Sequence, residues 1–427
     1  MIFYRADNWR AVGLTEGQVR NVVVVAHRGG RFDAPNTLIG VKKAVNYAQL
    51  NPDIRFMIEV DVQQCRSATP GEPGPLVVIH DSIVDFTTTG KGKVSSFTFD
   101  QLRSLTIRLT RKLTSAECLE PGDREDAGLL PTAEEDRRIP SLQEVLDVLD
   151  RANQYRHAKG IPLIGIGIDF THVASRMDRF KDHVLYPFLE KVSSGSQVNK
   201  VSAPEPLLNQ LAREISVRKG RTPLQIISQG VHGRPHLGML LKLIERSSVS
   251  FGIAVQASTS LFPADSRDVK AAVGLEAGKL DRLMRDGRFI INYTHRWDRL
   301  AYYLSRLIGS RSKFANPFYL APDRFAISNR EAMSQARKDG FRTGFCTVNS
   351  PDAIRDVILW GANMVTTDYP PRAVAFIREF VSGWLREEAG GGRFAVASHA
   401  RGSQARLGWT RQEGRQPAEE EGMLRNA

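Results

Sequence analysis

The chain has 427 residues, of which 41% are hydrophobic and 25% are charged, and its formal net charge at pH 7 is +12. This length accommodates one large α/β barrel or two ordinary domains. The basic residues lack interleaved aromatic side chains and a known nucleic-acid-reading motif, so we expect no nucleic-acid partner. The positive charge favours anionic small-molecule ligands and would also suit peripheral contact with an anionic membrane surface.

The cysteines and the N-terminal residues indicate the compartment. Cys65, Cys118 and Cys346 are odd in number, scattered and without metal-type spacing, so we expect no disulfide framework. The opening sequence MIFYRADNWRAVGL carries charges where a signal peptide requires an apolar region, and no later run is long enough to span a bilayer. We therefore expect a cytoplasmic protein without a transmembrane segment. No pattern in the chain indicates its oligomeric state.

The first predicted strand is the β-branched run VVVVA over residues 22–26, which is typical of a strand buried on both faces of a parallel sheet. It ends in HRGG, so His27 supplies a proton carrier and Arg28 a guanidinium that suits phosphate oxygens. The two glycines allow the backbone to approach a ligand closely. A turn without chemistry is the alternative for an isolated His-Arg pair. Apolar residues at helical spacing then predict a helix over residues 38–50.

The second predicted strand, FMIEVDVQQ over residues 56–64, carries two acids. Glu59 and Asp61 are two residues apart, so the period of a strand points both carboxylates to the same side. At the carboxyl end of a parallel strand, where barrel active sites form, such a pair predicts a site for a hard cation, Mg²⁺ or Ca²⁺. A surface-facing pair of acids is the alternative.

The third apolar run, PLVVIHD over residues 75–81, ends in His80 and Asp81. A second imidazole at the end of such a run could face His27, which would place two proton carriers beside a carboxylate pair. A His-Asp pair that only caps a strand is the alternative.

The later elements alternate between helices and strands. A short helix capped by Thr98 or Asp100 precedes a charged interval over residues 110–138, which we interpret as an insertion. Ser141, with Glu144 three residues later, predicts the start of an amphipathic helix. Further strand candidates are PLIGIGIDF, PLQIISQG, VSFGIAV, RFIINYT, RTGFCTVN and NMVTT.

This alternation predicts a single (β/α)8 TIM barrel of the α/β class over residues 20–380. The strand candidates number one more than such a barrel needs, so one of them, with the His80 run as the first choice, must pair outside it. From residue 386 onward the chain is rich in Gly, Arg, Glu, Ser and Gln and poor in apolar residues, which predicts a disordered tail over residues 386–427.

Taken in order, the motifs resemble the glycerophosphodiester phosphodiesterase family, in the superfamily that also holds the phosphatidylinositol-type phospholipases C. The resemblance rests on HRGG followed by NT, on Glu-x-Asp, on the His-Asp run before DFTTTGKGKV, and on FCTVNSPDAIRDVILWGANMVTTDYP. These matches and their spacing cover most of residues 22–376. Each motif alone is weak, but four of them in this order are specific.

The resemblance implies metal-dependent hydrolysis of glycerophosphodiesters to an alcohol and glycerol 3-phosphate, within lipid metabolism. His27 and His80 would be the acid-base pair, and Arg28 would bind the phosphate of the substrate. The ligands of the Mg²⁺ or Ca²⁺ ion would be Glu59, Asp61 and Asp169.

The chain departs from the family pattern at three positions. Thr171 stands where a lysine is expected after the third acid, although an aspartate at position 169 is similar to the related sphingomyelinase D type phospholipases. Pro35 stands where the first loop usually has a glutamate. Cys346 stands where tryptophan often lines the pocket, which predicts a roomier pocket.

Two alternatives follow from these departures. One is a phospholipase D-like lyase that acts on lysolipids or sphingolipids and releases a cyclic phosphate. The other is a barrel that binds phosphodiesters without catalysis. Asp368, in the closing Asp-Tyr-Pro, is interpreted as a structural end of the last strand, and Asp169 could be a helix cap instead of a metal ligand.

Overall fold

The computed structural model describes most of the N-terminal half of the chain and a smaller share of the rest. The described ranges, to which a few single residues are added, are 14–30, 32–107, 138–169, 205–216, 222–228, 251–256, 289–294 and 333–390. The expected insertion lies outside these residues except for Arg138, and so do residues 391–427 of the expected tail. No helix among the described residues is long and apolar enough to cross a bilayer.

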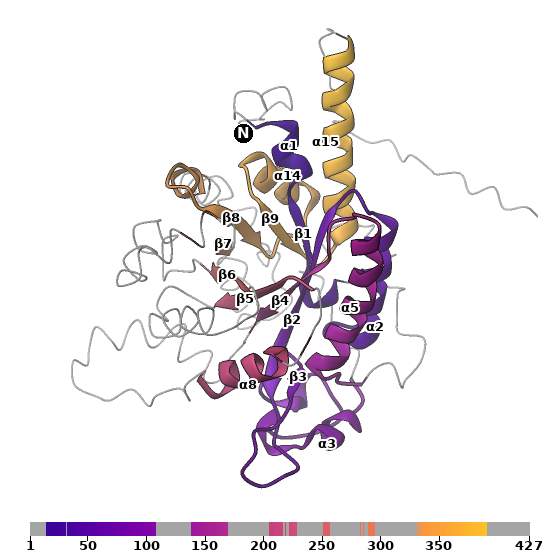
Figure 1. The fold of residues 1–427 in the computed structure, drawn as a ribbon, viewed down its shortest axis with the longest axis vertical. Helices are drawn as coiled ribbons and strands as arrows, with labels where there is room; N and C mark the ends of the chain where they lie inside the picture. Colours follow the sequence, from indigo (N-terminus) through magenta and orange to yellow (C-terminus); the bar gives the residue numbers. More distant parts are fainter. Residues whose placement is uncertain are drawn as a thin grey trace, which may run out of the picture.

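Eight parallel strands form a closed barrel (Figure 1). Around the barrel the order is β1-β9-β8-β7-β6-β5-β4-β2, and β2 pairs with β1 to complete the ring. The bounds are β1 Val23–Ala26, β2 Arg55–Gln64, β4 Gly165–Asp169, β5 Leu224–Ser228, β6 Phe251–Gln256, β7 Phe289–Thr294, β8 Arg342–Cys346 and β9 Met364–Thr367. The predicted (β/α)8 architecture is confirmed.

The remaining strand, β3 (Leu76–Val78), pairs antiparallel with the end of β2 and takes no part in the barrel. This is the run that leads to His80, which was the first choice for the surplus strand. Together with the short helix α3 (Phe99–Arg103) it forms a small lobe at one end of the molecule (Figure 1). The lobe has a hydrophobic cluster of its own, made of Cys65, Val77, Ile79, Val84, Val94, Leu102, Ile107 and Ile139.

The helices begin at capping residues that the sequence contains. Thr37 caps α2 (Leu38–Leu50), whose bounds agree with the predicted helix. Ser141 and Glu144 form a capping box at the start of α5 (Leu142–Ala158), and Thr98 caps α3. The other described helices are α1 (Glu16–Arg20), α8 (Glu205–Ser216), α14 (Pro351–Leu359) and α15 (Pro370–Gly390). Helix α15 therefore includes residues 386–390, the first part of the segment expected to be a tail.

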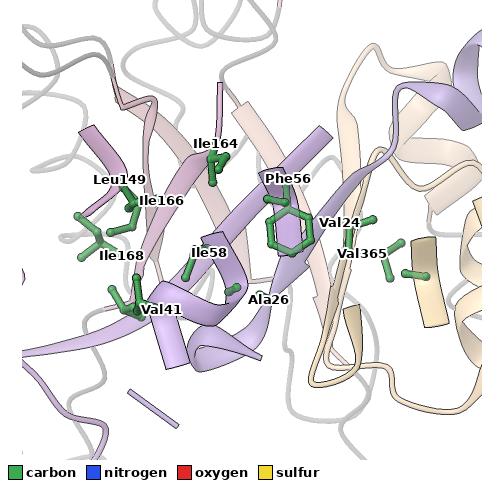
Figure 2. Close-up of a cluster of buried hydrophobic side chains, with 14 of the residues drawn as sticks. Val24, Ala26, Val41, Phe56, Ile58, Leu149, Ile164, Ile166, Ile168 and Val365 are labelled. Atoms are coloured by element: carbon green, nitrogen blue, oxygen red, sulfur yellow. The ribbon is translucent and has the colours of Figure 1, made fainter. Parts of the chain in front are cut away.

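The main hydrophobic core lies between the strands and the helices that surround them (Figure 2). Ile58, Ile166 and Ile168 point outward from β2 and β4 and pack with Val41 of α2 and Leu149 of α5; all five are fully buried. Burial of each such side chain stabilises the fold by about 1.5 to 3 kcal/mol. Because successive strand residues face opposite sides, this outward set directs the residues between them into the barrel.

Candidate active site

Three acids converge at the carboxyl ends of two neighbouring strands. Glu59 and Asp61 lie on β2, and Asp169 is the last residue of β4, directly paired with Asp61. One oxygen atom from each carboxylate lies within 4.8 Å of the others. The three residues are buried, with relative exposures of 2%, 1% and 6%. The surface-facing alternative for the two acids on β2 is therefore wrong.

The electrostatics of this acid cluster suit a cation. Burial raises the pKa of Glu59 well above its ordinary value, and the neighbouring charges of Asp61 and Asp169 raise it further. Burial acts in the same direction on Asp61, but the positive charges of Arg28, His80 and His27 outweigh it and hold the pKa of Asp61 at about 2. A group of buried oxygen donors with excess negative charge fits a hard divalent ion such as Mg²⁺ or Ca²⁺.

Arg28 contacts two residues of the acid cluster, Glu59 and Asp61. Its backbone is left-handed, with φ of 54°, and this conformation turns its N–H toward Glu59. The Arg28 N–H donates a 2.7 Å hydrogen bond to Oε2 of Glu59. Its Nε atom lies 3.0 Å from Oδ2 of Asp61, an ion pair whose N–H is not aligned for a hydrogen bond. Burial opposes the positive charge, but Asp61 and Glu59 raise the pKa of Arg28 above its ordinary value. The guanidinium is thus held as a cation beside the acids.

The loop before α2 supports Asp61 through a residue that sequence reasoning did not single out. Asn36, also left-handed with φ of 59°, donates from Nδ2 to Oδ2 of Asp61 at 2.8 Å and accepts from the Asp61 N–H at 3.2 Å. Pro35, at the position of the expected glutamate, is exposed. Asp33 is buried and pairs with Lys43 of α2, so it is directed away from the acids. The side chain that supports the site from this loop is therefore Asn36.

His27 is oriented by the last strand of the barrel. Its Nδ1 atom lies 2.8 Å from Oδ1 of Asp368, and its Nε2 atom lies 4.0 Å from Oε2 of Glu59. Asn349 fixes Asp368 by donating from Nδ2 to Oδ2 at 2.8 Å and by accepting from the Asp368 N–H at 2.9 Å. Asp368 follows the last residue of β9, as expected of a strand end, and its carboxylate also contacts His27. The Asn in the VNS sequence and the Asp after the last strand are the signals that could have indicated this contact.

His80 also lies near the acid cluster, since its charge acts on Asp61. Its Nδ1 atom lies 2.8 Å from Oδ1 of Asp81, and Nε2 of Gln63 donates to its carbonyl oxygen at 3.2 Å. Burial lowers the pKa of His80, and the nearby charge of Arg28 lowers it further. A hydrogen bond from Nδ1 to a carboxylate leaves Nε2 of a neutral imidazole free to accept a proton. Both histidines have this arrangement.

The structure thus brings together all six residues singled out from the sequence, namely His27, Arg28, Glu59, Asp61, His80 and Asp169. Thr171 lies outside the described residues. Cys346 is buried at the end of β8. It lies on the same face of the strand as Gly344, whose pairing partner Met364 belongs to the cluster inside the barrel, so Cys346 faces the barrel interior. An acid cluster with two imidazoles and a guanidinium close to it is suited to binding a phosphate and transferring protons to or from its ester oxygens.

Comparison with known proteins gives consistent matches. Residues 27–192 match the model of the glycerophosphoryl diester phosphodiesterase family. Glycerophosphodiester phosphodiesterase 1 of Mus musculus is 30% identical over 133 residues, which are 31% of this chain and 31% of that protein. A glycerophosphodiester phosphodiesterase of Caldanaerobacter subterraneus is 40% identical over 84 residues, which are 19% of this chain and 30% of that protein. The matched segment therefore spans less than a third of either relative.

Among solved structures, a glycerophosphoryl diester phosphodiesterase from Parabacteroides distasonis aligns with a TM-score of 0.43 at 14% identity, over 84% of this chain and 87% of that chain.

Proposed function

We propose that this chain, which belongs to the glycerophosphoryl diester phosphodiesterase family through residues 27–192, is a metal-dependent phosphodiesterase. It would hydrolyse glycerophosphodiesters to an alcohol and glycerol 3-phosphate and would act in lipid metabolism. The observation that carries this proposal is the convergence of three buried acids within 4.8 Å, with two imidazoles close enough to act on Asp61. A barrel that only binds phosphodiesters would not require two histidines that are each oriented by a carboxylate.

Glu59, Asp61 and Asp169 would hold the divalent ion. When bound, such an ion supplies positive charge that stabilises the negative charge developing on the phosphoryl oxygens. Arg28, held as a cation beside the acids, would bind the phosphate.

In this proposal each histidine carries out one of the two proton transfers. His80 is the base in this proposal, because its lowered pKa keeps it neutral at pH 7 and its Nε2 can accept a proton from the attacking oxygen. His27 is then assigned the role of the acid, and Asp368 orients its ring through the 2.8 Å contact with Nδ1. It gives its proton to the oxygen of the departing alcohol.

The proposal is tested by release of glycerol 3-phosphate from glycerophosphocholine and glycerophosphoethanolamine in the presence of Mg²⁺, Ca²⁺ or EDTA. We expect release that requires a divalent ion and that is lost in His27→Ala and His80→Ala. Asp53→Asn is a suitable control, because it alters an exposed ion pair with Arg378 at a distance from these groups. Absence of release with every ion in the wild-type protein would contradict the proposal.

The lyase alternative is separated by the product. Phosphorus NMR of the reaction would show glycerol 3-phosphate if water completes the reaction. Persistence of a cyclic phosphate, with lysolipids as the better substrates, would instead support a phospholipase D-like lyase.

A further inference from the structure

One buried amide oxygen inside the barrel lacks a hydrogen-bond partner. Gln225 on β5 is 5% exposed, and its Oε1 atom accepts no hydrogen bond from the residues that the structure describes. Leaving a buried acceptor unsatisfied is costly, so a folded protein that keeps one usually offers it to a ligand, an ion or an ordered water. The chemical question is which group this oxygen faces.

The strand register places Gln225 inside the barrel, at the level of the acid cluster. Gly167 on β4 pairs with Glu59 on one side and with Gln225 on the other, so the three residues occupy one level of the ring. The preceding residue, Leu224, belongs to the outer hydrophobic core, so the alternation of the strand directs Gln225 inward. Because Gly167 has no side chain, β4 places nothing between Gln225 and Glu59 at this level.

Gln225 lies deeper in the barrel than the carboxyl ends of the strands, from which a substrate would approach. Gly167, the partner of Gln225 on β4, lies two residues before Asp169 at the carboxyl end of that strand. Gln225 therefore lies one inward position deeper in the barrel than Asp169, while the histidines follow the carboxyl ends of β1 and β3. A substrate that approaches from the carboxyl ends of the strands reaches the histidines first, so an ion or its water is the group that Gln225 can meet.

We propose that Gln225 is a further oxygen donor of the cation site, reaching the ion or a water molecule bound to it from inside the barrel. This inference rests on the proposed metal-dependent function. Amide oxygens are ligands that Mg²⁺ and Ca²⁺ accept, and a neutral donor adds no repulsion to the three carboxylates. The unsatisfied oxygen and the gap at Gly167 are both accounted for in this way.

The test compares Gln225→Met with the wild-type full chain. Calorimetric titration with Mg²⁺ or Ca²⁺ alone should show affinity about 10- to 100-fold weaker in the variant, which is the usual effect of losing a group that supports a metal site. Thermal unfolding in EDTA should show the variant to be at least as stable as the wild type, because methionine removes an unsatisfied acceptor at similar volume. A second variant, Gln225→Glu, should bind the cations more tightly and be less stable in EDTA, because it adds a fourth acid.

Thr343→Val is the matched control. Thr343 on β8 is fully buried, its hydroxyl also lacks a partner among the described residues, and it lies on the same side of the strand as Phe345 of the outer core. Its replacement should match Gln225→Met in EDTA but leave cation affinity unchanged.

Three outcomes would overturn the inference. Equal cation affinity of wild type and both Gln225 variants would do so while leaving the proposed function intact. Loss of stability of Gln225→Met in EDTA would do so because the amide would then make a structural hydrogen bond. Failure of the wild type to bind either cation would remove the metal requirement of the proposed function and this inference with it.

Discussion

At the scale of single residues, the orientation of His27 depends on Asp368. In Asp368→Asn one carboxylate oxygen becomes an amide group, which cannot accept from both His27 and Asn349 as the native side chain does. We expect kcat on glycerophosphocholine to fall on the order of a hundredfold with little change in KM, because the variant loses orientation of an acid-base group and not substrate contacts. Steady-state kinetics on purified protein measures this, with Asp53→Asn as the control. A rise in KM at constant kcat would show that Asp368 binds substrate instead.

Without the cation, Glu59 should keep its proton to a higher pH than an ordinary glutamate, because its pKa is raised. Burial and the charges of Asp61 and Asp169 raise its pKa, and a divalent ion reverses that balance and expels the proton. Cation affinity should therefore increase with pH up to the raised pKa of the cation-free protein. Titration calorimetry in buffers of different ionisation enthalpy measures the released proton, and Glu59→Gln should release none. Heats that do not depend on the buffer in the wild type would contradict this prediction.

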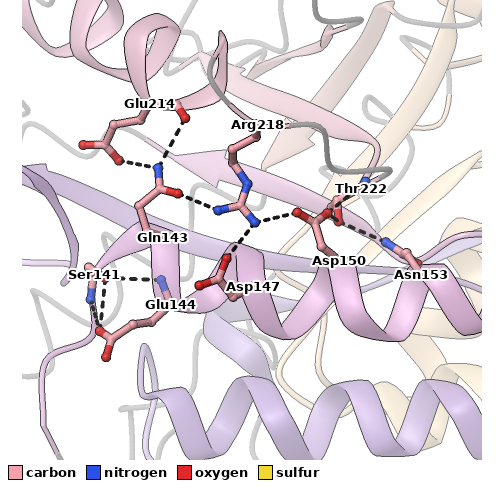
Figure 3. A network of polar contacts seen from close by, with 9 residues as sticks. All are labelled: Ser141, Gln143, Glu144, Asp147, Asp150, Asn153, Glu214, Arg218 and Thr222. Carbon is pink, nitrogen blue, oxygen red and sulfur yellow. Dashed lines mark hydrogen bonds and ion pairs between the residues drawn. The ribbon is translucent and has the colours of Figure 1, made fainter.

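At the scale of secondary-structure elements, α5 fixes the starts of two strands that carry site residues (Figure 3). Asn153 is fully buried, donates from Nδ2 to the carbonyl of Ile164 and to Thr222, and accepts from the Ile164 N–H. Ile164 immediately precedes β4, and Thr222 lies two residues before β5. Asn153 therefore helps to position the third acid, and together with Asp150, which also bonds Thr222, it helps to position the interior amide.

Asn153→Ala should lower the free energy of unfolding by about 3 kcal/mol, because it leaves backbone groups of Ile164 buried without partners. It should also weaken Mg²⁺ or Ca²⁺ binding, because β4 carries Asp169. Urea unfolding and calorimetry measure the two effects. Gln143→Ala is the control, since Gln143 joins the same network through Glu214 and Arg218 but contacts neither strand start. Equal loss of cation affinity in both variants would contradict the role of Asn153.

Local sequence patterns determine these elements more directly than they determine the contacts between them. Strands and helices could be predicted because apolar periodicity and capping residues are local, as α2 and its cap Thr37 show. The side chains at the ends of β1 and β2 could be assigned to the site, because alternation along a strand determines the face of the sheet to which each side chain points. The contact between His27 and Asp368 is signalled only by residue types, the Asn of VNS and the Asp after the last strand, since it joins the first and last strands of a ring whose closure no local pattern encodes. The support from Asn36 likewise depends on a left-handed turn that no spacing reveals.

At the scale of the whole molecule, the barrel has no open edge, because β1 pairs with both β2 and β9. His27 follows β1 and Asp368 follows β9, which are paired neighbours in the ring, so the contact between them exists only while the ring is closed. We therefore expect the two sides of the barrel to unfold together. Damage to the core on either side should remove activity and secondary structure in the same transition.

Phe345→Ala and Leu149→Ala test this coupling. Phe345 on β8 packs against Trp360 of the C-terminal side, and Leu149 of α5 packs in the outer core near β4; both are buried. Each variant should lower the free energy of unfolding by about 2 to 5 kcal/mol through the cavity it leaves. Urea transitions followed by circular dichroism and by residual activity should coincide in both variants, and Tyr155→Ala, at an exposed position of α5, should behave as wild type. Loss of activity in Phe345→Ala at a lower urea concentration than loss of the circular dichroism signal would contradict this prediction. It would indicate that the pairing of β1 and β9 breaks before the rest of the barrel unfolds.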